Sequence, residues 1–113
     1  MSRRDDGVSL GDMLSHAQEA IELLGEMSRE ALARDRVIQL ALARLMEIVG
    51  EAANRLSSAT QESYPGIPWA QVISMRDRLI HGCDVIDLDL LWETVRYDLP
   101  PLVEALREMV EEP

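Results

Sequence analysis

Apolar residues recur along most of this chain at steps of three or four positions, the spacing typical of amphipathic helices. The first run follows Ser9 and ends at Gly25, a residue type that commonly terminates a helix. A second run starts near Ser28 or Asp35 and continues to Leu56. The apolar positions expected to face the core are Leu10, Met13, Leu14, Ala17, Ile21, Leu24, Val37, Ile38, Ala41, Leu45, Ile48, Val49, Ala52 and Leu56.

The second half of the chain predicts two further helices. Residues 57–68 carry loop signals, and Pro68 suits the first turn of a third helix that Gly82 would end. Asp87 can cap a fourth helix, whose apolar stripe keeps its phase across Pro100 and Pro101. This pattern predicts one helix kinked at the proline pair, or two abutting helices. The apolar stripe of the third predicted helix consists of Trp69, Val72, Ile73, Leu79 and Ile80. That of the fourth consists of Leu88, Leu91, Val95, Leu99, Leu102, Leu106 and Met109.

No alternating strand pattern, internal repeat or low-complexity tract interrupts these helices. Gly50 lies inside the second one, where a glycine costs about 1 kcal/mol relative to alanine, so we expect another helix to approach closely there. A chain of 113 residues is long enough for one hydrophobic core. We therefore predict a single all-α domain over residues 1–113, an up-and-down bundle of four or five helices.

Charge and composition narrow the class of protein. The net charge of −10 argues against a protein that coats nucleic acid with a basic face, but not against an enzyme that handles a few phosphates locally. No apolar run approaches the roughly 18 residues needed to cross a membrane, and no secretion signal is evident. A single cysteine forms no internal disulfide, and no Cys/His cluster has zinc spacing. We expect a cytoplasmic protein with no metal site and no cofactor.

The stretch "RDRLIHGC" at the end of the third predicted helix gathers the chemistry-bearing side chains. Asp77 and His81 are four apart, so on a helix they would share one face and form a hydrogen bond that fixes the imidazole tautomer. The long side chain of Arg76 reaches the same place. An arginine neutralises phosphate oxygens while a histidine moves a proton, a pair suited to a phosphodiester. Arg78 is a further candidate phosphate contact. The alternative is a surface ion-pair network that merely closes the helix.

Several separated motifs resemble one family. "SMRDRLIHG", preceded by "GIPW" and followed by "LDLLWETVRYDLPPL", is similar to the HepT-like branch of the HEPN superfamily, and "MEIVGEAANRLS" resembles that family's long helix. The likeness extends from about Leu10 to Met109. It implies a HEPN-like helical fold and a metal-independent endoribonuclease toxin. Such toxins are encoded with a minimal nucleotidyltransferase (MNT) antitoxin in a type VII-like pair. The signature of arginine, a polar residue and a histidine falls here on Arg76, Asp77 and His81.

The resemblance also implies a composite site across a homodimer. Arg76 and His81 lie about 140° apart round an ideal helix, so one copy alone would not complete a site. In the implied mechanism His81 assists attack by the ribose 2′-OH on the adjacent phosphate or protonates the leaving 5′ oxygen. Arg76 stabilises charge on the phosphate, and Asp77 orients His81. The substrate would be tRNA or mRNA.

Cys83 departs from the family pattern. The family usually has a tyrosine here, to which the antitoxin attaches AMP groups, and a thiol is not an equivalent acceptor. The antitoxin then acts by binding alone, or modifies another residue, or Cys83 is a natural or engineered variant that escapes neutralisation. The nearest other tyrosine is Tyr97 on the fourth predicted helix, where packing or surface exposure is the ordinary role.

Two other readings remain open. The chain would be a non-catalytic helical module that partners a nucleotidyltransferase, or a plain interaction bundle that binds no RNA.

The roles of two residue pairs are also open. Glu47 and Glu51, one turn apart on the long helix, would form a paired acid set or a solvated or interface face. Trp69 and Trp92 suit core or dimer packing, with base stacking as the alternative.

Overall fold

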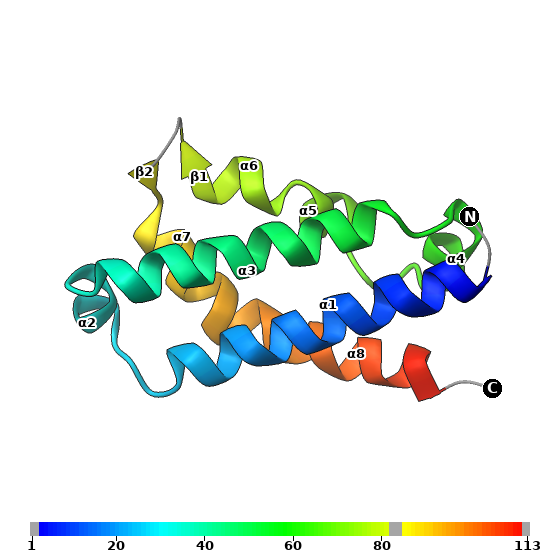
Figure 1. Cartoon of the computed structure of the whole chain (residues 1–113), viewed down its shortest axis with the longest axis horizontal. Coiled ribbons are helices and arrows are strands. Elements are labelled where there is room, and N and C mark those ends of the chain that lie inside the picture. The colour runs from blue at the N-terminus through cyan, green and yellow to red at the C-terminus, as the bar shows by residue number, and fades with distance from the viewer. Residues whose placement is uncertain (1–2, 82–84, 112–113) are drawn as a thin grey trace.

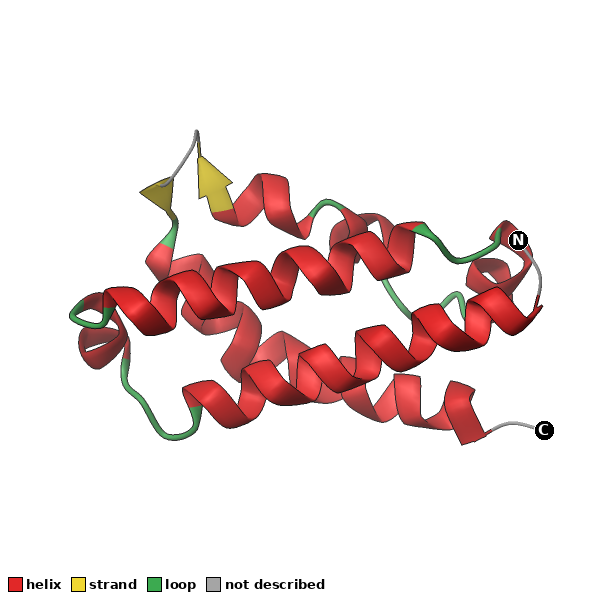
Figure 2. Ribbon diagram, in the orientation of Figure 1, coloured by secondary structure: helices red, strands yellow, loops and turns green. Residues whose placement is uncertain are grey.

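The computed structural model describes residues 3–81 and 85–111, and it confirms an all-α fold. Successive long helical segments reverse direction along the bundle, which is the predicted up-and-down arrangement (Figures 1 and 2). Across the described ranges no helix is both long and apolar enough to span a bilayer. The principal elements are α1 (Arg3–Leu24), α3 (Arg36–Asn54), α5 (Trp69–Ile73), α6 (Met75–Leu79), α7 (Leu88–Glu93), η1 (Thr94–Asp98) and α8 (Leu99–Glu111).

The boundaries of the first helices follow their capping residues. Gly25 ends α1 with a φ of +53°, a left-handed conformation that favours glycine. Ser28 caps the short helix α2 (Arg29–Ala33) by accepting a hydrogen bond from the Ala31 backbone N–H. Asp35 caps α3 in the same way through the Ile38 N–H. Both predicted starting points of the second run are therefore real, and they belong to two separate helices.

The core lies where α1, α3 and the segment from α7 to α8 meet. Most positions predicted to be apolar and inward-facing are buried, which confirms the helical periodicity. Val37 is the clear exception, because 75% of it is exposed at the first turn of α3. The largest fully buried side chains are Met13, Leu32, Leu42, Met46, Leu79, Leu91, Leu99, Leu106, Val49 and Val95.

Two sequence expectations about the N-terminal half are wrong. Helix α1 begins at Arg3, six residues before Ser9, and Ser9 itself is buried. The expected loop at 57–68 contains the short helix α4 (Ser58–Ser63), capped by Ser57. One buried residue accounts for both differences. Asp6 accepts hydrogen bonds from the Ser57 backbone N–H at 3.0 Å, the Ser57 hydroxyl at 2.6 Å and the Thr60 hydroxyl at 2.5 Å, and so joins α1 to the start of α4.

We expect this junction to make folding stability depend on pH. The hydrogen bonds from the Ser57 and Thr60 side chains hold the pKa of Asp6 below its usual 3.8. Its stabilisation is therefore complete above that value and is lost as the pH falls through the lower, folded-state pKa. Asp6→Asn should lower the free energy of unfolding at pH 7 by about 1–3 kcal/mol. In urea titrations that difference should shrink below pH 4. The exposed α1 variant Glu19→Gln is the control, and a difference constant with pH would contradict the assignment.

The predicted close approach at Gly50 is confirmed. A Cβ atom at this position would lie 3.1 Å from the Val72 carbonyl oxygen and 3.2 Å from that of Ile73. Both oxygens are backbone atoms that cannot rotate away, so a side chain here would push α5 off α3. Trp69 starts α5 and donates its indole N–H to the backbone oxygens of Gln61 and Tyr64, which supports the packing interpretation. Gly50 thus sets the distance between α3 and the segment that carries "RDRLIHGC".

The last helical segment contains a π-helical turn directly before its prolines. Asp87 caps α7 by accepting from the Leu90 N–H, as predicted. Residues Thr94–Asp98 form η1, and the Leu99 N–H donates to the Thr94 carbonyl, five residues back. Pro100 and Pro101 then follow at the start of α8, where they offer no N–H groups to the carbonyls of the preceding turn. The irregularity expected at the proline pair therefore lies one turn earlier.

Candidate active site

The helix that carries Arg76 and Asp77 ends before His81. Ile80 has extended backbone angles (φ −116°, ψ 119°), and it opens the strand β1 (Ile80–His81). This strand pairs antiparallel with β2 (Val85–Ile86), with Ile80 opposite Ile86 and His81 opposite Val85. The Asp87 N–H also donates to the Leu79 carbonyl at 2.8 Å. Together these bonds form a small hairpin that projects from the bundle beside α6 (Figure 1).

The expected helical pairing of Asp77 with His81 is therefore wrong. Beyond Leu79 the backbone is extended, so the four-residue spacing no longer places the two side chains on one face. Among residues 3–81 and 85–111, no hydrogen bond or ion pair joins them, and both are exposed. The strand is not predictable from the sequence, because two residues are too few for an alternating pattern. The physical reason is the β-branched Ile80, which the hairpin holds in an extended conformation.

Arg76 is held by a glutamate from the long helix. Its Nε–H donates to Glu47 Oε2 at 3.1 Å, and its Nη1 lies 3.6 Å from Asp77 Oδ1. Arg44 adds contacts of 3.8 Å to Glu47 and 3.6 Å to Glu51. Glu47 is only 23% exposed, whereas Arg76 is 53% exposed. The guanidinium is thus anchored on one edge, and it keeps donors available for an incoming anion.

Glu47 is the contact that sequence reasoning did not assign. The sequence alone groups it with Glu51, as a paired acid set or a solvated or interface face. A signal was present nevertheless: Gly50 predicts an approaching helix, and Glu47 lies one turn before it on α3. The helix that approaches Gly50 is α5, which leads directly into Arg76 of α6. The paired acid set is not what the structure shows, because arginines lie against both carboxylates.

The remaining candidates lie apart from Arg76. Arg78 points along a different side of α6, and its Nη2 donates to the Gln71 carbonyl at 3.0 Å. The surface network proposed for Asp77, Arg78 and His81 is not formed within the described ranges. Trp92 donates its indole N–H to the Met27 carbonyl at 2.8 Å and meets the Tyr97 ring edge-on at 5.6 Å, consistent with packing.

Cys83 lies outside the residues that the structure describes. Within the described part of the chain, no group of three or more His, Cys, Asp or Glu side chains is arranged to hold a metal ion. What the described residues do offer is one anchored, partly exposed guanidinium on α6 and one exposed imidazole on β1. These are an anion-binding group and a proton-transfer group on adjoining elements.

Comparison with known proteins identifies the family to which the chain belongs. The model of the family described as "Ribonuclease HepT-like" matches residues 13–109, and the chain belongs to this family. "Probable ribonuclease HepT" of Thermococcus cleftensis is 39% identical over 95 residues, which cover 80% of this chain and 86% of that protein. "Putative RNase MJ0125" of Methanocaldococcus jannaschii is 30% identical over 112 residues, 99% of this chain and 97% of that protein. No solved structure matches the chain.

Proposed function

We propose that this protein is a metal-independent endoribonuclease that acts as the cytoplasmic toxin of a toxin–antitoxin pair. The observation that carries the proposal is the presence of Arg76, anchored by Glu47, and of the exposed His81 on adjoining elements. Both residues lie inside the segment that matches the HepT-like ribonuclease family. The names of the related proteins, which describe them as RNases, support the same activity.

The chemistry needs only groups that these residues and the RNA supply. The ribose 2′-OH attacks the adjacent phosphorus, the P–O5′ bond breaks, and a 2′,3′-cyclic phosphate and a free 5′-OH result. His81 takes the proton from the 2′-OH or gives one to the leaving 5′ oxygen. Arg76 stabilises the negative charge that grows on the phosphate oxygens. DNA lacks the 2′-OH and is not a substrate for this reaction.

The exposed face of α3 supports a homodimer. Val37, Leu40, Arg44, Glu47 and Glu51 follow one another at steps of three and four residues, the spacing of a coiled-coil seam. Val37 and Leu40 are 75% and 48% exposed, although both are large and apolar. The same face meets Arg76 through Glu47. A second copy of the chain that covers this stripe would bury the apolar residues and bring two copies of the site together.

Asp77 fits a role across this dimer better than within one chain. Its side chain is 82% exposed, and the contact to Arg76 is long. In the proposed dimer Asp77 orients His81 of the second copy, a contact that the short helix α6 does not permit within one copy. Arg76 and Asp77 of one protomer then act with His81 of the other. This assignment keeps the three residues in one composite site.

The proposed partner is an MNT-type nucleotidyltransferase encoded beside this chain. Because cysteine replaces the usual tyrosine at position 83, attachment of AMP at that position is not available. We therefore propose that the antitoxin inhibits by binding, through a surface that includes the α6–β1 segment. Growth arrest by this chain alone, relieved by co-expression of its genomic neighbour, is the expected result. Harmless expression with intact tRNA and mRNA would instead favour a non-catalytic binding module.

Purified protein provides the direct test of the activity. The chain should cleave RNA in the presence of EDTA and leave 2′,3′-cyclic phosphate ends. An oligonucleotide with a 2′-deoxyribose at the cleavage position should resist at that position, because the attacking group is missing. Fragment ends can be assigned by mass spectrometry. Cleavage of the deoxy substrate, or activity only after a divalent cation is added, would contradict the mechanism.

A further inference from the structure

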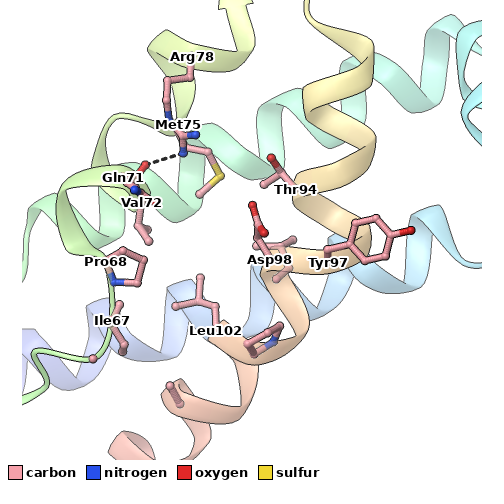
Figure 3. Close-up of a pocket in the computed structure, with 14 residues that line it drawn as sticks. Ile67, Pro68, Gln71, Val72, Met75, Arg78, Thr94, Tyr97, Asp98 and Leu102 are labelled. Carbon is pink, nitrogen blue, oxygen red and sulfur yellow. Dashed lines mark hydrogen bonds between the residues drawn. The ribbon is translucent and has the colours of Figure 1, made fainter.

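A pocket lies beside α6, away from the Arg76–Glu47 contact. It is a cavity of about 300 Å³ between the α5–α6 segment and the turn from η1 into α8 (Figure 3). This volume is at the lower end of the range for pockets that hold small molecules. Its apolar wall is formed by Ile67, Val72, Met75, Leu99 and Leu102. Arg76, Asp77 and His81 do not line it.

Three polar side chains reach this pocket from two sides. Thr94 and Asp98 come from the ends of η1, and their oxygen atoms point toward the α5–α6 side (Figure 3). Arg78 comes from α6 and is fixed at the rim by its hydrogen bond to the Gln71 carbonyl. Tyr97 belongs to the same turn, but its ring points away from the cavity (Figure 3). The π-helical turn, a feature often found at functional sites, thus presents two acceptor groups together.

Thr94 is the observation that points to a ligand. It is only 3% exposed, yet its hydroxyl has no hydrogen-bond partner within the described part of the chain. A buried hydroxyl without a partner destabilises a protein by about 1–3 kcal/mol, and a helical threonine ordinarily satisfies its hydroxyl on a backbone carbonyl. Asp98 is exposed and, among the described residues, forms no hydrogen bond or ion pair, so its carboxylate is open to a ligand at the mouth of the pocket. Two oxygen acceptors therefore face an apolar cavity, and nothing in the described chain occupies them.

We propose that this pocket binds an unpaired guanine base. The apolar wall suits the faces of a flat heteroaromatic ring. Guanine is the base that presents two adjacent N–H donors, N1–H and the N2 amino group, which a carboxylate accepts side by side. Adenine, cytosine and uracil do not present two adjacent donors on that edge. Asp98 binds this donor pair, the Thr94 hydroxyl bonds a further polar atom of the base, and Arg78 contacts the adjoining phosphate.

The place of the pocket relates it to RNA cleavage. Arg76 and Arg78 are two residues apart on α6, so they point to opposite sides of one short helix. An RNA strand that crosses α6 would set one nucleotide in the pocket and present a nearby phosphate to Arg76. This step rests on the proposed ribonuclease function. Binding of the base itself does not, because a free guanine nucleotide offers the same ring and phosphate.

Nucleotide binding can be measured without any cleavage. Titration of the full chain with GMP, AMP, CMP and UMP, followed by ¹H–¹⁵N NMR, should show shifts at Gln71, Thr94 and Asp98 that saturate with GMP first. Asp98→Asn should weaken GMP binding at least about tenfold, because the amide replaces one acceptor by a donor. Glu108→Gln, an equal charge change on α8 outside the pocket, should leave binding unchanged. Equal shifts with all four nucleotides, or none, would overturn the proposal.

A second variant separates a ligand contact from a structural one. Thr94→Val keeps the shape of the side chain and removes the unpartnered hydroxyl, so the melting temperature should stay the same or rise while GMP binding weakens. A lower melting temperature with unchanged binding would overturn the role of Thr94.

The positions at which RNA is cut distinguish a guanine within the RNA strand from a free guanine nucleotide. If the cuts lie at a fixed distance from guanines and Asp98→Asn abolishes that preference, the pocket binds a guanine of the RNA strand. If Asp98→Asn leaves the cuts unaltered although the wild type binds GMP, the pocket binds a free nucleotide. RNA cleavage without GMP binding would refute the pocket alone, and GMP binding without cleavage would refute the ribonuclease alone.

Discussion

His81→Ala is expected to lower the rate of RNA cleavage in EDTA by at least about 100-fold, the usual contribution of a proton-transfer group. Arg76→Ala should cause a loss of similar size by removing the positive charge at the phosphate. His81 is exposed on a two-residue strand, so its truncation leaves no cavity in the core. Gel assays of a defined RNA, with far-UV circular dichroism as the check on folding, measure the effect.

His16→Ala is the matched control for this experiment, because His16 is the other histidine of the chain. It lies within α1, where its Nδ1 is 2.7 Å from the Asp12 carbonyl oxygen, remote in sequence from the proposed site. Its replacement should leave cleavage within about twofold of the wild type, since surface changes away from a site have small effects. If His81→Ala cleaves as fast as the wild type, the role given to His81 is refuted.

Mixing the two inactive variants is expected to restore cleavage. When protomers of Arg76→Ala and His81→Ala exchange freely, half of the dimers are mixed, and each mixed dimer holds one of its two Arg76–His81 pairs across the interface. The expected rate is therefore about a quarter of the wild-type rate, compared with about 1% or less for either variant alone. Cleavage assays after subunit exchange, with dimer formation followed by sedimentation, measure this recovery.

The control for recovery is a mixture of His81→Ala with the double variant Arg76→Ala/His81→Ala. This mixture contains no histidine at position 81 in any dimer, so it should remain inactive. If the mixed single variants also stay inactive while dimers exchange normally, Arg76 and His81 act within one chain, and the composite site is wrong. A chain that cleaves RNA as a monomer would refute the composite site in a different way.

Much of the fold is predictable from the sequence because helices leave local signals. Gly25 and Asp87 mark helix ends through their own conformational and hydrogen-bonding preferences, and Gly50 marks a close contact. The junction at Asp6 was not predictable in this way. Its partners Ser57 and Thr60 are about fifty residues away, and nothing local indicates that a carboxylate so early in the chain is buried.

The sequence predicts which residues form the candidate site, but it does not predict how they are arranged. Arg76, Asp77 and His81 were recognised from their order, but their relation depended on a helix that stops at Leu79. The hairpin that stops it is formed by pairing between residues on both sides of positions 82–84, which is a tertiary preference, not a helical propensity. The pocket at Thr94 was also not predictable, because the π-helical turn η1 is defined by backbone hydrogen bonds that leave no pattern in the sequence.

The cluster of charges shared by α3 and α6 bears on how tightly the proposed ribonuclease would hold RNA. Arg44, Glu47, Glu51 and the attached Arg76 carry no net charge together, within a chain of net charge −10. Few counterions are then released when RNA binds. With one or two phosphates engaged, affinity should fall only about three- to sevenfold between 50 and 200 mM salt. In the proposed ribonuclease, selection of a cleavage position would thus depend on contacts to a particular nucleotide, and a general attraction to the RNA backbone would contribute little.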